Sequence, residues 1–345
     1  MESRMIDLRS DTFTKPTSAM RDFMIKAEVG DDVFGEDPTA NELQKMIAEM
    51  LAKESALFVA SGTQANQISI NAQTRPGQEV ICDYNAHIFN YESGAAGMLS
   101  GVQLHPITGK LGHPTAEQIS EVIRPFDDHY PQTGLICLEN THNRAGGTVF
   151  PLKEIEKISE LARRKGLRMH LDGARLWNAA VATGITIAEY ASHFDSVSLC
   201  FSKGLGAPVG SIVVGSNDFI KRAHFYRKAC GGGMRQIGIL AAACIFAVEN
   251  HFDRLNEDHQ HARMLAETFA ALPGFKVDLD SVETNIVIVD VSGTGKDAFE
   301  ITGLLKDNKI LVLPFSVAKI RLVTYLNLTL SDIKQAIGIL KKLFK

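Results

Sequence analysis

The central part of the chain alternates between two kinds of apolar pattern. Short apolar runs at 134–139, 167–172 and 196–201 are typical of buried strands, whereas 152–165 carries apolar residues at helical spacing and is followed by Gly166. Strands separated by helices pair in parallel, because a parallel return needs a crossover of a dozen or more residues. The pattern therefore predicts an α/β fold whose large domain is a mainly parallel sheet flanked by helices.

The regions on either side of this core have different patterns. Residues 1–35 lack clear periodicity and predict an irregular N-terminal arm. The first helix is expected to begin at Thr39, which forms a capping-box pattern with Glu42. Beyond a long helical region, short strands and a last helix predict a smaller α+β unit. We therefore expect a large domain at 36–250 and a small C-terminal domain at 251–345.

Composition excludes several classes of function. The hydrophobic content of 45% and charged content of 22% are those of a globular protein. A net charge of −4 gives no reason to expect nucleic acid or an anionic membrane as a partner. We also expect no signal peptide and no membrane span. The cysteines are five, and four lie in apolar segments, so we expect buried thiols in a cytoplasmic protein rather than disulfides or a metal site.

The polar residues of the predicted sheet gather where its strands end. Glu139 and Asp172 end two strands, and Lys203 stands just past a third; parallel sheets bind their ligands at this carboxyl edge. A partly desolvated lysine amine loses its proton easily and is the usual nucleophile for Schiff-base chemistry. An isolated lysine in such a place often only extends to solvent. Lys203 is therefore a candidate that depends on what surrounds it.

Pyridoxal phosphate is the cofactor that such a lysine would bind, and the sequence offers candidates for its other contacts. Ser61, Gly62 and Thr63 lie between a short apolar run and a helical pattern, where backbone N–H groups bind phosphate. Asp172, about one strand–helix crossover before Lys203, would keep the ring nitrogen protonated so that the ring can accept electrons. Taken singly, both features are also typical of helix caps.

Further residues fit the cofactor ring and a substrate. Arg175 could reach the ring hydroxyl oxygen and His87 could cover the ring face, although a surface charge and a structural histidine are the ordinary alternatives. An amino-acid substrate needs an arginine for its carboxylate. Arg321 lies in the apolar run 320–323 and is costly to bury unpaired, so a carboxylate of the protein or of the substrate must meet it.

These residues lie in longer motifs that together match a known family. The chain resembles the low-specificity L-threonine aldolases, within the aspartate-aminotransferase-like group of pyridoxal-phosphate enzymes. Each motif is weak alone, but together they cover nearly the whole chain. The motifs are LRSDTFTKPT at 8–17, VGDDVFGEDPT at 29–39, FVASGTQAN at 58–66, ENTHNRAGGTV at 139–149, HLDGARLWNA at 170–179, SKGLGAPVGS at 202–211, GGGMRQ at 231–236 and IRLVT at 320–324.

The resemblance implies a role for each residue already singled out. Lys203 would bind the cofactor as a Schiff base, with Asp172 at the ring nitrogen, Arg175 at the ring oxygen and His87 on the ring face. Ser61, Gly62 and Thr63 would bind the phosphate, and Ser10 together with Arg321 would bind the substrate carboxylate. The implied reaction is retro-aldol cleavage of L-threonine, L-allo-threonine and related β-hydroxy-α-amino acids to glycine and an aldehyde.

Two more residues take their roles only from the resemblance. Arg235 would approach the phosphate from a neighbouring subunit, and His129 would be a second active-site histidine near the substrate hydroxyl. The resemblance therefore also implies a homo-oligomer, a dimer or a homotetramer, whose site is completed across subunits. The base that takes the hydroxyl proton is His87, His129 or a water held by one of them, and the preference between threonine and allo-threonine stays open.

Other functions are compatible with parts of the sequence. A β-eliminating lyase or a glycine hydroxymethyltransferase-like enzyme on the same fold is the nearest alternative. A nucleotide-binding protein is not supported, because Val209 replaces the last glycine of a near GxGxxG pattern and Asp290 the first glycine of a near P-loop. A binding module without catalysis would have no need of Lys203, Asp172 and Arg321 together.

Overall fold

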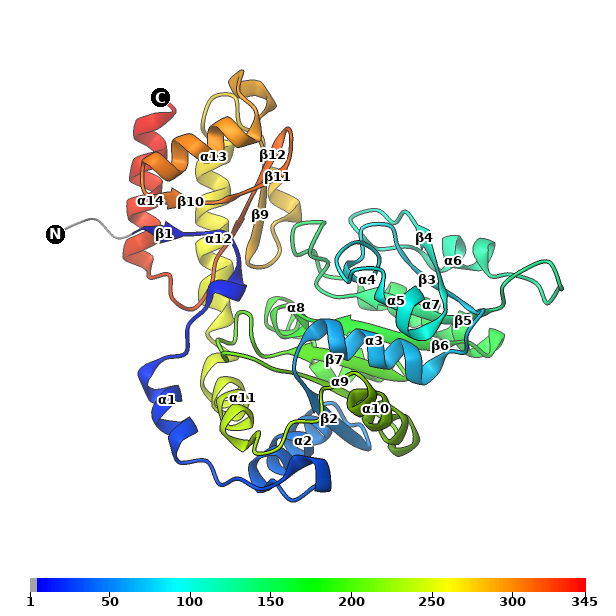
Figure 1. Ribbon diagram of the computed structural model, residues 1–345. Helices are drawn as coiled ribbons and strands as arrows, with labels where there is room; N and C mark the ends of the chain where they lie inside the picture. Colours follow the sequence, from blue (N-terminus) through cyan, green and yellow to red (C-terminus); the bar gives the residue numbers. More distant parts are fainter. Residues whose placement is uncertain (1–4) are drawn as a thin grey trace.

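A seven-stranded sheet forms the centre of the larger part of the molecule (Figure 1). The computed structural model describes residues 5–345. In the order β2–β8–β7–β6–β5–β3–β4, the pairs from β7 to β4 are parallel, and β8 is antiparallel to both of its neighbours. The predicted mainly parallel sheet is therefore confirmed. The strands are β2 (Ser55–Val59), β3 (Glu79–Asp83), β4 (Gln103–Ile107), β5 (Thr133–Glu139), β6 (Arg168–Gly173), β7 (Ser196–Cys200) and β8 (Ser211–Gly215).

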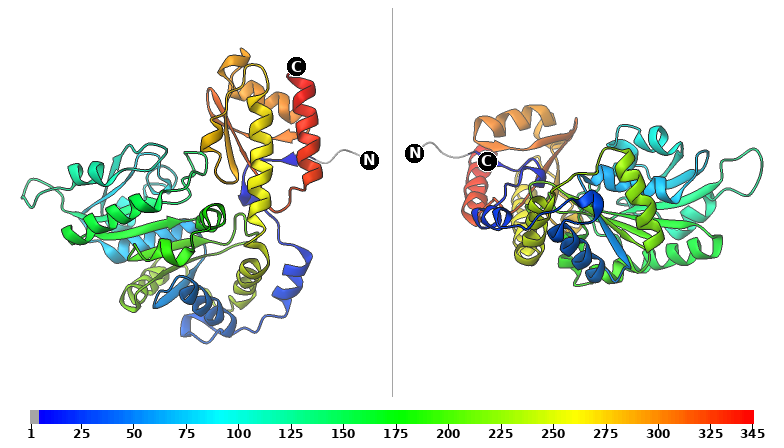
Figure 2. Two further views of the ribbon diagram at one scale, coloured as in Figure 1. Left: turned by 180° about the vertical axis from the view of Figure 1, so that it is seen from behind. Right: turned by 60° about the horizontal axis from the view of Figure 1, so that its bottom comes forward.

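Helices cover both faces of this sheet, as Figures 1 and 2 show. Leu57 of β2 packs with α3 and α10, whereas its neighbour Phe58 packs in the larger cluster with α2 and α11. Successive strand residues point to opposite faces, so a strand covered on both sides is apolar throughout. The helices are α2 (Pro38–Met50), α3 (Gly62–Gln73), α4 (His87–Asn90), α5 (Ala95–Ser100), α6 (Ala116–Val122), α7 (Leu152–Lys165), α8 (Leu176–Thr183), α9 (Ile187–Ala191), α10 (Asn217–Ala229) and α11 (Gly238–His251).

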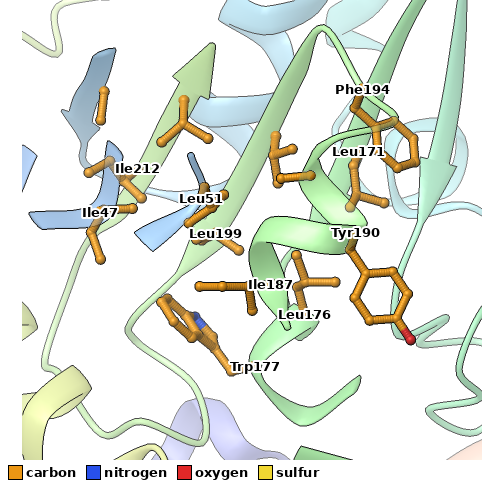
Figure 3. Packing of buried hydrophobic residues seen from close by; sticks show 14 of the residues in the cluster. Ile47, Leu51, Leu171, Leu176, Trp177, Ile187, Tyr190, Phe194, Leu199 and Ile212 are labelled. Atoms are coloured by element: carbon orange, nitrogen blue, oxygen red, sulfur yellow. The ribbon is translucent and has the colours of Figure 1, made fainter. Parts of the chain in front are cut away.

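The larger apolar cluster includes buried residues of β5, β6, β7 and β8, and Figure 3 draws part of it. Leu171 and Leu199 come from the strands, and Leu176, Trp177 and Tyr190 come from α8 and α9. The predicted helix 152–165 is confirmed as α7, whose chain direction reverses at the left-handed Gly166 (φ 67°). Only a residue without a Cβ adopts this conformation at little cost.

A smaller unit packs around a second apolar cluster. An antiparallel sheet, ordered β11–β12–β9, lies against long helices, and β1 near the N-terminus pairs in parallel with β10 (Figures 1 and 2). The chain start therefore joins the C-terminal unit. The boundaries at 35/36 and 250/251 stay predictions. The elements are β1 (Ile6–Asp7), α12 (Leu255–Ala270), β9 (Ile286–Asp290), α13 (Ala298–Asp307), β10 (Ile310–Leu311), β11 (Leu313–Ser316), β12 (Lys319–Val323) and α14 (Leu330–Leu343).

Three local expectations are corrected. The arm is not irregular throughout, because it contains α1 (Ser18–Ile25), capped by the Thr17 side chain. Helix α2 begins at Pro38 rather than Thr39. Its cap is Asp37, whose carboxylate accepts from the Ala40 N–H at 2.9 Å. The Thr39 hydroxyl instead donates to a loop carbonyl. The long helical region after 233 is two helices, α11 and α12. Helix α11 packs in the larger apolar cluster, whereas α12 contributes Leu255 to that cluster and Ala262, Leu265 and Phe269 to the second one.

The structure bears on two expectations from composition, which concern the cysteines and membrane-spanning helices. Cys82, Cys137, Cys200 and Cys244 are buried free thiols, as predicted, whereas Cys230 is exposed. Across residues 5–345, no helix combines the length and the hydropathy that a bilayer crossing requires.

A buried ion pair ties the N-terminal arm to the sheet, and it predicts a large stability effect. The Arg227 and Asp32 side chains are almost fully buried with 2.8 Å between Nη2 and Oδ2, and Nη1 donates to the Phe58 carbonyl. The substitution Arg227→Met would leave Asp32 buried without a counter-charge and lower the free energy of unfolding by about 3–5 kcal/mol. Urea unfolding measures this change. Lys45→Met, which removes an exposed pair with Glu49, should change it by less than ~1 kcal/mol; equal losses in both variants would contradict the prediction.

Candidate active site

The carboxyl edge of the parallel strands brings most of the predicted residues together. Asp172 lies at the end of β6, and Lys203 follows β7. Helix α3 begins beside them, because a Cβ added at Gly62 would lie 2.8 Å from the sulfur of Cys200, the last residue of β7. Polar atoms of His87 and Asp172 lie within 4.8 Å of each other. Strand topology therefore assembles residues that are far apart in the chain.

Asp172 is buried and remains a carboxylate. Its oxygens accept hydrogen bonds from the Asn66 side-chain amide at 2.7 Å and from the Ala174 N–H at 3.1 Å. Burial by itself would raise the pKa of Asp172, but the positive charges of His87 and Lys203 and the Asn66 bond outweigh it and lower that pKa. An ionised carboxylate at this position can keep a heterocyclic nitrogen protonated.

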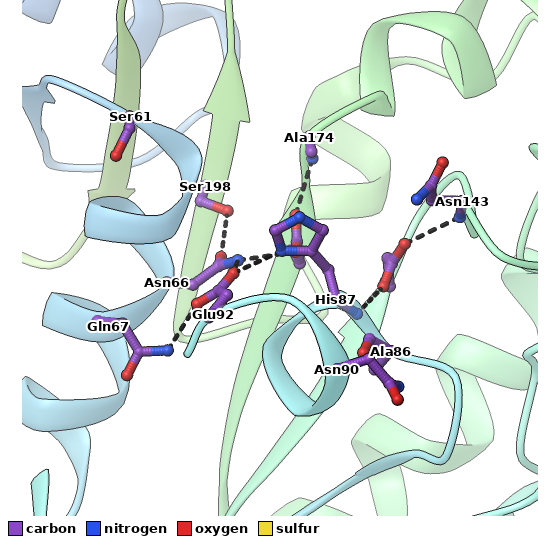
Figure 4. A network of polar contacts seen from close by, with 12 residues as sticks. Ser61, Asn66, Gln67, Ala86, His87, Asn90, Glu92, Asn143, Ala174 and Ser198 are labelled. Carbon is purple, nitrogen blue, oxygen red and sulfur yellow. Dashed lines mark hydrogen bonds and ion pairs between the residues drawn. The ribbon is translucent and has the colours of Figure 1, made fainter. Parts of the chain in front are cut away.

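Helix α4 holds His87 between two acids (Figure 4). Its backbone N–H donates to Glu139 at 2.7 Å, and its Nδ1 lies 2.8 Å from the Glu92 carboxylate. Burial by itself disfavours the imidazolium, but the Glu92 hydrogen bond and the charge of Asp172 outweigh it and raise the pKa of His87. About a third of the side chain stays exposed (33%), so the ring can meet a bound molecule.

The first turn of α3 is suited to an anion. The Ser61 hydroxyl accepts from the Gln64 N–H at 3.2 Å and caps the helix. Gly62 lets this turn approach β7 more closely than any side chain would allow. Thr63 adds a partly exposed hydroxyl. The first N–H groups of a helix have no partner within the helix, so they and the hydroxyls are available to phosphate oxygens.

Arg175 is buried against Asp11, a residue to which the sequence motifs assigned no role. The two side chains form paired hydrogen bonds of 2.7 Å each, and Asn285 also donates to Asp11. Burial by itself would raise the pKa of Asp11, but Arg175 and Lys203 lower it to about 2. The guanidinium is thereby fixed in place beside the Lys203 charge.

Arg321 comes from the C-terminal unit and has no acidic partner. Its Nη1 donates to the Asn143 side-chain oxygen at 3.1 Å and its Nη2 to the Arg9 carbonyl at 3.3 Å, while Nε is buried with no hydrogen-bond partner. Within residues 5–345 no carboxylate pairs with it. Ser10, beside Arg9, is buried and caps the short turn that follows. Among residues 5–345, therefore, no protein carboxylate fills the role expected of a partner for Arg321, which leaves its free N–H available to the carboxylate of a bound molecule.

Two predicted residues lie apart from the others in this chain. The His129 side chain is 89% exposed and pairs with Asp127, and the Arg235 side chain is 54% exposed and pairs with Asp31. They lie on loops between β5 and α6 and before α11. Their roles stay predictions.

Several residues around the site had no role in the sequence interpretation. Asp11, Asn66, Glu139 and Asn143 lie inside the motifs at 8–17, 58–66 and 139–149, so the motifs contained a signal that single-residue reasoning did not use. Glu92 lies outside every motif, and only its contacts reveal it.

The residues present fit pyridoxal phosphate. The Lys203 amine has no hydrogen-bond or ion-pair partner in the part of the chain that the structure describes, yet its charge acts on Asp172 and Asp11. The N–H groups of the first α3 turn could donate to a phosphate, and Arg321 Nε, which has no partner among residues 5–345, could donate to a carboxylate. The ionised Asp172 could accept from a protonated pyridine nitrogen.

Comparison with known proteins leads to the same chemistry. The model of the beta-eliminating lyase family matches residues 7–292. A probable low-specificity L-threonine aldolase 2 of Arabidopsis thaliana is 44% identical over 348 residues, covering 99% of this chain and 98% of that protein. The low specificity L-threonine aldolase of Escherichia coli K12 is 42% identical over 326 residues, covering 94% and 95%. The chain belongs to the low-specificity L-threonine aldolase family. As members of this family are pyridoxal-phosphate-dependent lyases, it is such an enzyme.

Solved structures confirm the predicted aspartate-aminotransferase-like fold of this threonine aldolase family member. A Leishmania major threonine aldolase superimposes with a TM-score of 0.84 at 22% identity, over 98% of this chain and 99% of that one. A Thermus thermophilus aspartate aminotransferase variant superimposes with a TM-score of 0.74 at 14% identity, over 99% and 92%.

The Arg175–Asp11 pair predicts a defined pH dependence of stability. A carboxyl group with a lowered pKa stabilises the fold above its unfolded value of about 3.9, and this contribution disappears as the pH falls through the folded value of about 2. Asp11→Asn should lower the free energy of unfolding at neutral pH by about 3–5 kcal/mol, because Arg175 remains buried without a counter-charge.

The difference between the wild type and Asp11→Asn should shrink between about pH 4 and pH 2, since the wild-type carboxyl is protonated there. Unfolding curves across this pH range measure it. Asp7→Asn, which removes a more exposed acid paired with Arg9, is the control and should have a small effect. A difference for Asp11→Asn that is the same at every pH would contradict the prediction.

Proposed function

We propose that this protein cleaves L-threonine, L-allo-threonine and related β-hydroxy-α-amino acids to glycine and an aldehyde, with pyridoxal phosphate as cofactor. The observation that carries the proposal is the Lys203 amine beside ionised Asp172, at a site that also holds Arg321. Among residues 5–345, Lys203 has no hydrogen-bond or ion-pair partner and Arg321 has no acidic partner. Relatives covering nearly the whole chain bear the name of this activity.

Each contact of the cofactor would have a candidate residue. When bound, the cofactor supplies an acceptor for the electrons of the bond that breaks. Lys203 would bind it covalently, Asp172 would keep its ring nitrogen protonated, and His87 would cover the ring. The other candidates are Arg175 for the ring oxygen, Ser61, Gly62 and Thr63 for the phosphate, and Arg235 of a second copy, also for the phosphate.

Arg321 and Ser10 would hold the substrate carboxylate. Asn143 and the Arg9 carbonyl fix the guanidinium from one side, so that its remaining N–H groups point to the substrate. Because a fixed carboxylate restricts the rotation of the amino acid, this contact selects the Cα–Cβ bond for cleavage. The proton of the β-hydroxyl would pass to His87, to His129 or to a water held by one of them.

The site would be completed in a homo-oligomer. Arg235 and His129 are exposed on their own chain, and apolar side chains are exposed on α1 and the segments near it, among them Phe23, Ile25 and Phe34. Apolar groups gathered in this way favour contact with another chain. We propose a dimer or a homotetramer, located in the cytoplasm, where the buried thiols would stay reduced.

Each of the three predicted segments would supply different residues of the site. The arm at 1–35 would supply Ser10, the domain at 36–250 would hold the cofactor, and the domain at 251–345 would supply Arg321.

The activity is tested with purified protein, added pyridoxal phosphate and threonine. We expect a visible absorbance band and acetaldehyde formed in proportion to glycine, and Lys203→Ala should lack both. Protein that stays colourless would contradict the cofactor. The match to the beta-eliminating lyase family favours a β-eliminating lyase as the alternative function. Release of pyruvate from serine would support that alternative. Cleavage that depends on tetrahydrofolate would instead support a glycine hydroxymethyltransferase-like enzyme.

Arg321 predicts a separate effect on substrate binding. Arg321→Gln should raise the KM for threonine roughly 10- to 100-fold, because charged hydrogen bonds to the carboxylate are worth about 1.5–3 kcal/mol. Steady-state kinetics at saturating cofactor measure it. The matched control is Lys319→Gln, which removes an exposed charge two residues earlier on β12 and should leave KM nearly unchanged. An unchanged KM in Arg321→Gln would remove Arg321 from the substrate site.

A further inference from the structure

Glu92 is a buried acid with three hydrogen-bond donors and no assigned role. Its side chain is fully buried. It accepts from the Asn66 amide at 2.9 Å and the Gln67 amide at 2.6 Å, and it lies 2.8 Å from His87 Nδ1 (Figure 4). Two side-chain amides therefore donate to this carboxylate beside the His87 ring. An ionised carboxylate can only accept, so the contact with His87 requires hydrogen on Nδ1.

The neighbouring contacts fix this arrangement. The Asn66 side-chain nitrogen donates to both Glu92 and Asp172, and its oxygen accepts from the Ser198 hydroxyl at 2.9 Å and faces His170 Nε2 at 3.1 Å. The amide therefore has only one orientation that satisfies all its partners. His87 Nε2 forms no hydrogen bond within residues 5–345. The ring thus keeps its proton on the buried side and leaves Nε2 free.

We propose that Glu92 is the positioning residue of His87: it holds the Nδ1–H tautomer and presents Nε2 to the β-hydroxyl of the substrate. The inference rests on the proposed function and names the proton acceptor that it left open. The hydroxyl proton moves to Nε2 as the Cα–Cβ bond breaks and the aldehyde C=O bond forms. The electron pair of the broken bond stays with the glycine fragment, and Glu92 stabilises the imidazolium. His87 is the catalytic residue, and Glu92 acts through it.

The charges that face His87 set its basicity. Glu92 follows it in the chain, Asp172 comes from β6 and Glu139 from β5, and all three raise its pKa against the effect of burial; the positive charge of Lys203 faces Asp172. Of the three acids, only Glu92 contacts the ring nitrogen. Removing its charge should therefore lower the pKa of His87, because the imidazolium loses its nearest counter-charge.

The first test compares Glu92→Gln with a matched control, using the holoenzyme and threonine. In the wild type, kcat/KM should rise with pH as His87 loses its proton. In Glu92→Gln this rise should move to lower pH by about one unit or more, and the plateau should fall at least ~tenfold as the base weakens. The control is Glu79→Gln, which removes another buried acid paired with a histidine, at 3.2 Å from His105 Nδ1. In this variant the pH at which kcat/KM rises should not change. A lower plateau with an unmoved rise in Glu92→Gln would overturn the proposal.

The second test measures His87 directly and does not need turnover. Histidine labelled with ¹³C at Cε1 gives NMR titrations of the holoenzyme, and His87→Gln identifies the His87 signal. Glu92→Gln should lower the His87 midpoint by about one unit or more, while Glu79→Gln leaves it in place. A midpoint that stays in place in Glu92→Gln would overturn the proposal. If the wild type releases no aldehyde, the proposed function fails, whereas this titration still decides whether Glu92 controls His87.

A third variant covers a failure of Glu92→Gln to fold. Glu92→Asp keeps the charge but withdraws it by one methylene, so the His87 midpoint and the pH of the kinetic rise should both move down by a smaller amount. Values equal to those of the wild type in both measurements would overturn the proposal.

Discussion

The structure depends on supplying N–H donors to buried carboxylates at one edge of its sheet. Asp172, Glu92, Glu139 and Asp11 are all nearly inaccessible to water, and a buried charge without partners would be neutralised or would unfold its surroundings. Each of the four instead accepts from N–H groups of amides, an imidazole, a guanidinium or the backbone. The carboxyl edge therefore carries concentrated negative charge, which stabilises cations placed beside it.

Glu139 links the two halves of the proposed site. Its carboxylate accepts from the backbone N–H of His87 at 2.7 Å and from that of Asn143 at 2.9 Å. Asn143 in turn contacts Arg321. The residue proposed to cover the cofactor and the residue proposed to bind the substrate are thus positioned by the same buried acid. Such shared support holds catalytic groups to a fixed separation, which rate enhancement requires.

Residues 6–8 pair with strands of the C-terminal unit. The Leu8 N–H donates to the Leu311 carbonyl, and the Val323 N–H donates to the Leu8 carbonyl, each at 2.8 Å. This pairing places the Arg9 carbonyl, which directly precedes Ser10, against Arg321 and brings Asp11 to Arg175. The arm therefore contacts both parts of the molecule. Asp11 fixes Arg175, the residue that precedes α8 in the larger part, although the two lie 164 residues apart in sequence.

Local pattern in the sequence determined the sheet, helix α7, the buried thiols and the placement of Asp172 and Lys203, because a parallel sheet necessarily gathers its strand ends at one edge. The sequence pattern did not determine where α2 begins, because Asp37 and Thr39 can both cap a helix. Only the folded chain decides between them, since the Thr39 hydroxyl donates to the Glu28 carbonyl and leaves Asp37 as the cap. Tertiary structure alone decided the partners of the buried charges: Asp11 for Arg175, Asn143 for Arg321 and Glu92 for His87. The spacing of these pairs, from five residues between His87 and Glu92 to 178 between Asn143 and Arg321, follows no helical or strand period, so only the folded chain brings their polar atoms within hydrogen-bonding distance.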